Sequence, residues 1–454
     1  MHRHLRKPAR PGPVAGYGRS FTAQPAQPIP RWNNVERSEN RDRKRRYAVS
    51  DEQDSYIGRR VRQIRARRGL TQQVLADRSG ISRSVLAKYE AGLRPVDSRR
   101  TLLALAEALG VTLNDLTGHE DDRFDPAVAG VHASVPEIET AFWAEGDVTS
   151  TAPPRSLDLL AVAALEVEQL SVRCDYASLA PKLAPLITET YQTIDRVSGA
   201  ERDRAHDVLA SAAITTSSVL SRFGHTSLAW TATQAAETAA RATGSTAALA
   251  AAAFTRSQML MTRAGGLHAA HRHAEATADE LCAAARTVGD VEHSGMLRLQ
   301  AGLATAVLGG DPDPHFTEAA EHARKLAGAE PGTPLLRNPT FGHANVQLWR
   351  LSAAMERRDA EQVLALASTL APADLPSVGR RAQYFIEVGR AHALRRDHRQ
   401  SLHALLRAEH AAPQKVRNMG HVREIVGHMM RRARRDLTTG ELGSLARRVG
   451  VVPN

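Results

Sequence analysis

The chain has 454 residues, of which 42% are hydrophobic and 4% aromatic, and its formal net charge is +11. This length allows two or three domains with sizeable cores, and the abundance of alanine favours closely packed helices over a sheet sandwich. No apolar run reaches the ~18 residues of a membrane span, and the basic N-terminus lacks the apolar stretch of a secretory signal. Two distant cysteines, Cys174 and Cys282, suit a reducing compartment. We therefore expect a cytoplasmic protein that does not enter a membrane.

The positive charge is concentrated near the N-terminus. Residues 1–50 carry a net +9, residues 51–118 carry +4, and the remainder carries −2. This distribution is expected where the first quarter of a chain meets a polyanion. Residues 1–50 also contain six prolines and no hydrophobic period, which predicts a disordered basic tail. A tail that is merely solvated remains an open alternative.

Residues 53–118 are predicted to form a compact unit of five helices. Ile57, Val61 and Ile64 recur at helical spacing and give the first helix one apolar face. Thr71 and Ser82 are suitable N-caps for the second and third helices. Glycine at position 80 permits a tight turn between them. The fourth and the short fifth helix have their apolar positions at Leu102, Leu105, Ala106, Leu109, Leu113 and Leu116.

The second and third helices of this unit present two different faces. One face is apolar and is predicted to be buried; it consists of Leu75, Ala76, Ile81, Leu86 and Tyr89. Arg83, Ser84 and Lys88 fall together on another face, which is predicted to be exposed.

Residues 56–116 resemble the phage repressor/Cro-like (XRE-type) helix-turn-helix family through the order "GLTQ…LA…GIS…L…YE.G". The resemblance implies an all-α, five-helix DNA-binding domain. Residues 82–90 would be its recognition helix, with the N-terminus of that helix in the major groove. Arg65 and Glu90 match the family's buried Arg–Glu pair, which ties the first helix to the end of the recognition helix.

The same resemblance implies which residues contact DNA. Arg83 is the best candidate to bind a guanine edge through two hydrogen bonds, and Ser84 and Lys88 could reach bases or phosphate. Val85 could touch a thymine methyl group or pack in the core, and both interpretations remain open. Gln72 resembles the family's glutamine that clamps a phosphate. The predicted DNA-binding set is Gln72, Gln73, Ser82, Arg83, Ser84, Val85, Lys88 and Arg94.

The rest of the chain is predicted to be helical. Residues 119–156 read as a linker with a short helix at 135–143, and residues 157–451 contain a recurrent turn. This turn appears as "RFGH" (222–225), "RAGG" (263–266), "LGGD" (308–311), "RRDA" (357–360) and "RRDH" (395–398). The clearest copy, residues 385–413, resembles a tetratricopeptide repeat, with small residues at Gly389 and Ala408 that allow close helix packing. We predict an α-solenoid of tetratricopeptide-like helical hairpins.

Motifs of catalysis are missing from the sequence. It contains no GxxxxGK[ST], HExxH or GxSxG motif and no paired cysteines at zinc spacing, so we expect neither an enzyme nor a bound metal or cofactor. The stretch "HAAHRH" (268–273) could place His268 and His271 on one helix face. An exposed histidine-rich helix is the favoured interpretation of this stretch.

The sequence thus favours a sequence-specific regulator that binds double-stranded DNA as a homodimer. In this hypothesis the helical repeats bind a peptide or a partner protein, or mediate oligomerisation. The alternative is an interaction scaffold whose helix-turn-helix does not read DNA.

Overall fold

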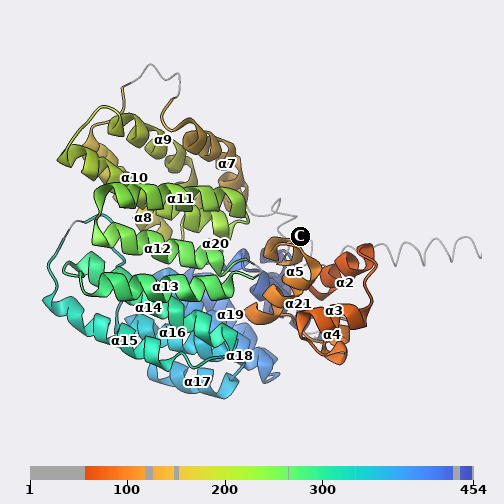
Figure 1. The fold of residues 1–454 in the computed structure, drawn as a ribbon. Helices are drawn as coiled ribbons and strands as arrows, with labels where there is room; N and C mark the ends of the chain where they lie inside the picture. Colours follow the sequence, from red (N-terminus) through yellow and green to blue (C-terminus); the bar gives the residue numbers. More distant parts are fainter. Residues whose placement is uncertain are drawn as a thin grey trace, which may run out of the picture. The chain divides into compact units, whose positions relative to one another are not determined.

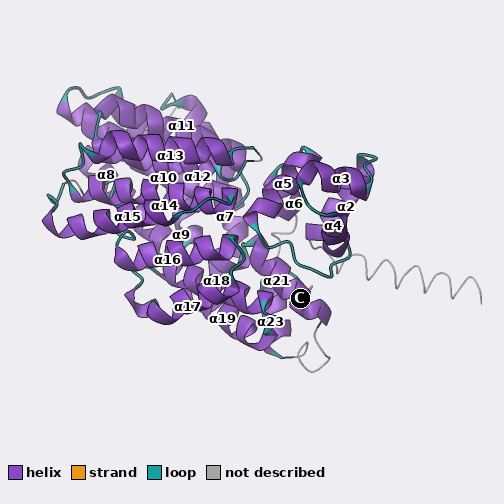
Figure 2. Cartoon of the chain, turned by 60° about the horizontal axis from the view of Figure 1, so that its bottom comes forward, coloured by secondary structure: helices purple, strands orange, loops and turns teal. Residues whose placement is uncertain are grey.

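The computed structural model describes residues 57–117, 126–147, 153–263, 265–332, 334–432 and 440–451. In this part of the chain every regular element is a helix, and the only β pairing is an isolated bridge between Thr287 and Glu330 (Figure 2). The predicted all-α fold is therefore confirmed. The tail predicted to be disordered, residues 1–50, lies outside the described residues.

Residues 57–117 form five helices, which we call the N-terminal bundle. Their bounds are α2 (Ile57–Arg67), α3 (Gln72–Ser79), α4 (Arg83–Glu90), α5 (Arg99–Leu109) and α6 (Leu113–Thr117). The side chains of Thr71 and Ser82 cap α3 and α4 by accepting hydrogen bonds from the N–H groups of Val74 and Val85. Gly80, with φ of 64°, makes the turn between these helices in the left-handed region, which glycine adopts without steric cost.

The bundle has a hydrophobic core of its own. Leu75, Ala76, Leu86 and Tyr89 are buried and Ile81 is partly buried, as their spacing predicts. They pack with further buried residues from α2, α5 and α6, namely Ile57, Val61, Leu102, Leu105, Ala106, Leu109 and Leu116, and with Val96 of the loop before α5. This core is separate from the two hydrophobic clusters of the remaining helices.

Helix α7 (Pro126–Ala144) is longer than the short helix predicted for residues 135–143. Proline is common in the first turn of a helix, so the sequence predicts that the helix begins close to Pro136. In the structure Pro136 lies inside the helix, because Val131 and Val128, about one and two turns before it, are buried in the same cluster as Ile138. The segment expected to be a linker thus contributes to the core.

The remaining helices form antiparallel hairpins, which we call the helical array. Its helices are α8 (Leu157–Val172), α9 (Tyr176–Ile194), α10 (Ala200–Arg222), α11 (Thr226–Thr243), α12 (Thr246–Leu260), α13 (Leu267–Cys282), α14 (Val288–Leu308), α15 (Asp313–Lys325), α16 (His343–Glu356), α17 (Ala360–Thr369), α18 (Val378–Leu394), α19 (His398–Ala411), α20 (Pro413–Arg417), α21 (Gly420–Arg432) and α23 (Glu441–Arg448). Consecutive hairpins pack against one another from α8–α9 to α18–α19 (Figure 1). The array of helical hairpins predicted from the sequence is confirmed.

All five recurrent turns join the two helices of a hairpin, and the structure adds a sixth at residues 173–175. In the "RRD" turns the second arginine has positive φ, 62° for Arg358 and 63° for Arg396, and the aspartate caps the next helix. The turn "RCD" has the same geometry, with φ of 57° at Cys174 and Asp175 as the cap. Its sequence differs from the "RRD" pattern because a cysteine replaces the second arginine.

The hairpin of α18 and α19 shows why small residues recur in this pattern. A Cβ atom on Gly389 would lie 3.1 Å from the side chain of Leu405, which is fully buried. The hydroxyl of Ser401 donates a hydrogen bond to the Gly389 carbonyl at 2.8 Å. The close helix approach predicted from Gly389 is therefore present, and a buried hydrogen bond from Ser401 supports it.

Hydrogen bonds connect the N-terminal bundle to the array within one compact unit. The buried carboxylate of Glu424, on α21, accepts from the backbone N–H groups of Ile57 at 3.1 Å and of Val96 at 3.2 Å. Arg390, on α18, donates to the backbone carbonyl of Asp97 at 2.7 Å. The Asp97 carboxylate also pairs with Arg358. These contacts attach the start of α2 and the loop between α4 and α5 to α18, to α21 and to the turn between α16 and α17.

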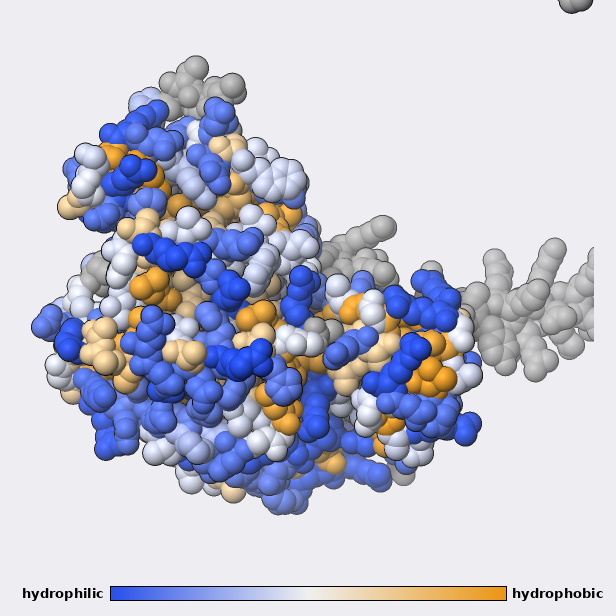
Figure 3. Space-filling model, viewed as in Figure 1, coloured by the Kyte–Doolittle hydropathy of each residue, from blue (hydrophilic) through white to orange (hydrophobic). Residues whose placement is uncertain are grey.

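The surface shows no large apolar patch on the face seen in Figure 3, where hydrophilic side chains dominate and apolar ones form small groups. Among the helices of the described segments, none is both long enough and apolar enough to cross a bilayer.

Close packing at Gly295, on α14, gives a test of the fold. A Cβ atom there would overlap the ring of Phe341, whereas a Cβ on Gly130, in α7, would meet no neighbour. We expect Gly295→Ala to lower the free energy of unfolding by ~1–3 kcal/mol through overpacking. The control Gly130→Ala should raise it by up to ~1 kcal/mol, because alanine is the better helix former. Urea denaturation monitored by circular dichroism measures both, and equal responses would contradict the packing described.

Candidate nucleic-acid interface

The N-terminal half of α4 presents a polar, cationic face. Arg83, Ser84 and Lys88 are all exposed, while Leu86 and Tyr89 on the opposite side of the helix are buried. The helix begins directly after Ser82, whose Oγ accepts from the Val85 N–H at 3.4 Å. The structure therefore brings together the three side chains predicted to share an exposed face.

A buried ion pair holds this helix in place. Arg65, on α2, donates from Nε to Glu90 Oε1 at 2.6 Å and from Nη2 to Glu90 Oε2 at 2.9 Å. A third N–H group of Arg65 donates to the Leu70 carbonyl at 2.8 Å. The hydrogen bond to Glu90 raises the pKa of Arg65 above its usual value. The pair predicted between these residues is thus confirmed, and it ties α2 to the last residue of α4.

Gln72 joins the same carboxylate, which the sequence did not indicate. Its amide nitrogen donates to Glu90 Oε2 at 2.8 Å, and the side chain is half-buried. The amide is therefore engaged inside the bundle in this structure. The phosphate contact of Gln72 stays a prediction, and it would use the same amide group.

The other predicted DNA-binding residues have local partners. Ser82 uses its hydroxyl as the cap of α4, and Val85 is half-buried against the core of the bundle. Gln73 donates to Asp77 Oδ1 at 2.8 Å on the exposed side of α3. The guanidinium of Arg94 lies 5.5 Å from the centre of the Tyr89 ring. Among the predicted set, Arg83, Ser84 and Lys88 are the exposed residues of α4 itself.

Residues 57–117, with this arrangement of helices, match the family model of a helix-turn-helix domain. The N-terminal bundle is a helix-turn-helix domain. In this domain α3 and α4 are the two helices joined by the turn at Gly80, and α4 occupies the position of the recognition helix.

Two proteins are similar to parts of this chain. A segment of 71 residues is 42% identical to a propionyl-CoA carboxylase regulator of Cereibacter sphaeroides. That match covers 16% of this chain and 15% of the regulator, so the similarity spans a small part of either protein. The crystal structure of Bacillus thuringiensis PlcR in complex with the peptide PapR7 and DNA is similar over 60% of this chain and 96% of that one, with 14% identity and a TM-score of 0.29.

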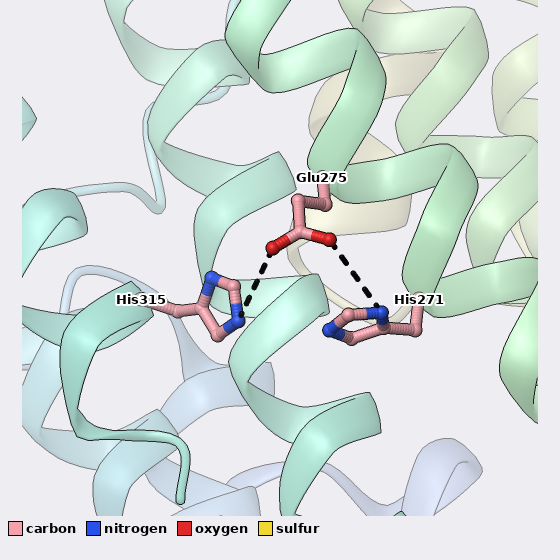
Figure 4. A group of neighbouring side chains, drawn as sticks. All are labelled: His271, Glu275 and His315. Carbon is pink, nitrogen blue, oxygen red and sulfur yellow. Dashed lines mark ion pairs between the residues drawn. The ribbon is translucent and has the colours of Figure 1, made fainter.

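One group of side chains outside the helix-turn-helix domain has the donor atoms that a divalent metal would need. His271 Nδ1 and His315 Nε2 lie 3.7 Å and 4.0 Å from the two oxygens of Glu275 (Figure 4). Histidines that bind a metal usually donate their second ring N–H to an acceptor. Nδ1 of His315 has no such partner among the described residues. We therefore interpret the group as polar contacts of Glu275 with His271 on the same helix, α13, and with His315 on α15. His268 and His273 are not part of it.

The buried pair gives a test of how the recognition helix is held. Arg65→Met leaves the carboxylate of Glu90, which is 3% exposed, with Gln72 as its side-chain donor. We expect the domain to lose about 3 kcal/mol of stability, the cost of leaving a buried charge without its partner. Hydrogen exchange of the α4 amides, read by mass spectrometry, should rise in this variant. Arg67→Met, on the exposed face of α2, is the matched control and should change stability by less than ~0.5 kcal/mol. Unchanged protection in Arg65→Met would argue against the pair.

Proposed function

We propose that this protein is a DNA-binding transcriptional regulator whose helix-turn-helix domain reads one half-site of an operator. The observation that supports this most is the exposure of Arg83, Ser84 and Lys88 at the start and middle of α4, on a helix whose other side is locked into the core. A helix of this kind enters the major groove with its N-terminal residues against the base edges.

In this proposal the exposed residues divide the work between specificity and affinity. Arg83 is the first residue of α4, where a guanidinium reaches O6 and N7 of a guanine, and such a contact discriminates between bases by ~1–3 kcal/mol. Lys88 lies more than one turn further along and supplies charge toward the phosphates. The Arg65–Glu90 pair keeps the face rigid, so that little conformational entropy is lost on binding.

The helical array would carry the regulatory part of this function. We propose that it binds a peptide or a partner protein, or mediates the pairing of two chains, so that two helix-turn-helix domains meet half-sites about 34–36 Å apart. The array contacts the domain through Glu424, which accepts a hydrogen bond from Ile57, and through Arg390, which donates one to Asp97. A ligand of the array could act on the domain through these contacts. A ligand shifts the domain only if it binds one arrangement of these contacts more tightly than another. A cytoplasmic location, predicted from the sequence, agrees with a role on DNA.

Selection of bound duplexes from a random pool tests the proposal against a scaffold that does not read DNA. We expect the full chain to enrich one motif with two symmetric halves whose centres are 10–10.5 base pairs apart. Enrichment of a single half would contradict the dimer, and a pool without any motif would contradict DNA reading.

Two substitutions on α4 test the role of each side chain. Arg83→Ala should lower affinity for the selected motif by ~5- to 150-fold and relax selectivity at one base pair. Lys88→Ala should weaken binding to all sequences and reduce the steepness of the salt dependence, because one phosphate contact fewer releases fewer counterions. Footprinting at two salt concentrations measures both effects. The control Arg202→Ala removes the same charge from an exposed position on α10 and should change neither. Unchanged selectivity in both α4 variants would remove the assigned role of this helix.

A further inference from the structure

A cavity lies inside the helical array, away from the recognition helix. Its volume is about 250 Å³, slightly below the ~300–1,000 Å³ of typical small-molecule sites. It is lined by residues of α8, α9, α10, α12, α14, α18 and α20, together with Cys174 and residues 336–340 of the segment before α16. The lining is polar over much of its extent and includes the hydroxyls of Ser171, Ser211, Thr215, Ser218, Thr255 and Thr340.

Three cationic side chains converge on this cavity from three different helices. Arg222 is the last residue of α10, Arg380 belongs to the first turn of α18, and Lys415 lies in α20. Lys415 is only 9% exposed. Within the described part of the chain, none of the three forms an ion pair with a carboxylate. The buried arginines Arg298 and Arg390 of the array, by contrast, each pair with one.

Each of the three is positioned by neutral groups. Nζ of Lys415 donates to the Gly379 carbonyl at 2.7 Å, and Nη2 of Arg380 approaches Oγ1 of Thr340 at 3.4 Å. The guanidinium of Arg222 lies 5.5 Å from the centre of the Tyr176 ring. Its Nε has no hydrogen-bond partner among the described residues. The side chains are therefore oriented, but the positive charge that they bring together is not neutralised.

The surroundings make this charge unfavourable in the absence of an anion. Burial first, and then the positive charge of Arg222, lower the pKa of Lys415 to about 7. Cys174 opposes this shift, and Arg380 adds to it. Burial, with Arg222 next to it, lowers the pKa of Arg380 to about 10. An anion bound between these groups would offset both the lost hydration and the mutual repulsion.

The beginning of α18 adds to the positive character of the cavity. Ser377, Gly379 and Arg380 line it, and they form the N-cap and first turn of this 17-residue helix. The partial positive charge at a helix N-terminus favours an anion there. The helix terminus and the three cations thus point to the same kind of ligand.

We propose that this cavity binds a small organic molecule through an oxyanion group, a carboxylate or a phosphate, which Arg222, Arg380 and Lys415 hold together. This binding site goes beyond the proposed reading of DNA, and only its regulatory consequence rests on that function. A volume of about 250 Å³ admits a metabolite, whereas a peptide of several residues requires an extended groove.

The other polar feature of the cavity is Glu168, on α8. Burial and the nearby carboxylate of Glu292 raise its pKa to about 8, so it is protonated at neutral pH and can donate a hydrogen bond to the ligand. Glu168 also lines a neighbouring hollow of about 340 Å³, together with Val172, Arg337 and Pro339, which are shared by both. This hollow offers space for the part of the ligand that carries no charge.

The cavity is connected to the contacts that hold the helix-turn-helix domain. Helix α18 carries Arg380 near its start and Arg390 nearer its end, where Arg390 donates to the Asp97 carbonyl. Lys415 lies in α20, directly before α21, whose Glu424 accepts from Ile57 and Val96. A ligand that draws Arg380 and Lys415 together therefore acts on two elements that contact the domain.

Thermal unfolding and calorimetric titration of the full chain with simple anions test the proposal. Sulfate, as a phosphate substitute, and succinate are the probes, and succinamide is the neutral control. We expect one of the anions to raise the melting temperature to a saturating value, and succinamide to have no effect. Stronger binding of sulfate would indicate a phosphate ligand, and stronger binding of succinate a carboxylate ligand.

Variants locate the binding in the cavity. Arg222→Gln and Lys415→Met should each weaken anion affinity at least tenfold, and Arg222→Gln serves if Lys415→Met does not fold. Arg202→Gln, an exposed arginine of the same helix as Arg222, should bind as the unchanged chain does. Failure of both anions to saturate, or equal binding by the cavity variants, would overturn the site. Binding of tetra-alanine with a free carboxylate, but of neither small anion, would overturn the assignment to a small molecule.

The pH dependence provides a separate check. In the cavity Lys415 is charged below about pH 7 and neutral above it, and Glu168 becomes negative above about pH 8. Both changes disfavour an anion as the pH rises, while sulfate keeps its charge. We expect sulfate to bind several-fold more weakly at pH 8.5 than at pH 6.5, and Lys415→Met to reduce this difference. Affinity that stays constant in the unchanged chain would contradict the role of Lys415. None of these measurements uses DNA, so their failure would leave the proposed DNA binding intact.

Discussion

The position of α4 depends on one buried carboxylate, that of Glu90. It accepts hydrogen bonds from Arg65 on α2 and from Gln72 on α3, and it is itself the last residue of α4. Three helices thus meet at a single charged group inside a small core. A buried charge is stable only when its hydrogen-bonding partners are complete, so a shift of α2 or of α3 would take away one of its donors. This requirement keeps the exposed face of α4 in one orientation while its own side chains remain available to a partner.

Local signals in the sequence were sufficient for most of the fold. Caps such as Thr71 and Ser82, the turn glycine at position 80 and the apolar spacing of the first helices depend on residues a few positions apart, and the structure has them as predicted. The small residues of the α18–α19 hairpin are equally local. The sequence predicts too short a helix at 135–143, because Pro136 is typical of a helix start. Buried residues on both sides of Pro136 make α7 continuous from Pro126 to Ala144. The turn at Cys174 shares its positive φ with the turns at Arg358 and Arg396 but not their residue type, so the sequence pattern does not indicate it.

The features that the sequence could not indicate all join distant segments. Arg222, Arg380 and Lys415 are separated by more than 150 residues from first to last, and none belongs to a motif. Only the packing of hairpins brings them into one cavity. The same is true of Glu424, which looks like an ordinary surface acid of an amphipathic helix until the backbone of Ile57 is placed beside it. Within the candidate interface, the exposure of Arg83 follows from the apolar spacing of α4 and is confirmed. The hydrogen bond of Gln72 to Glu90 depends on how α3 packs against α4, which the spacing does not indicate.

The contact at Glu424 has a consequence for how the helix-turn-helix domain can move. Burial raises the pKa of this carboxylate, and the N–H groups of Ile57 and Val96 oppose that rise. A small displacement would lengthen both hydrogen bonds before water could enter, so intermediate positions are the least favourable ones. Full separation would hydrate the carboxylate of Glu424 again and remove the free-energy cost of burying it. The domain and the array should therefore exchange between two discrete states, docked and released, and a ligand of the array would change the populations of these states instead of bending the molecule gradually.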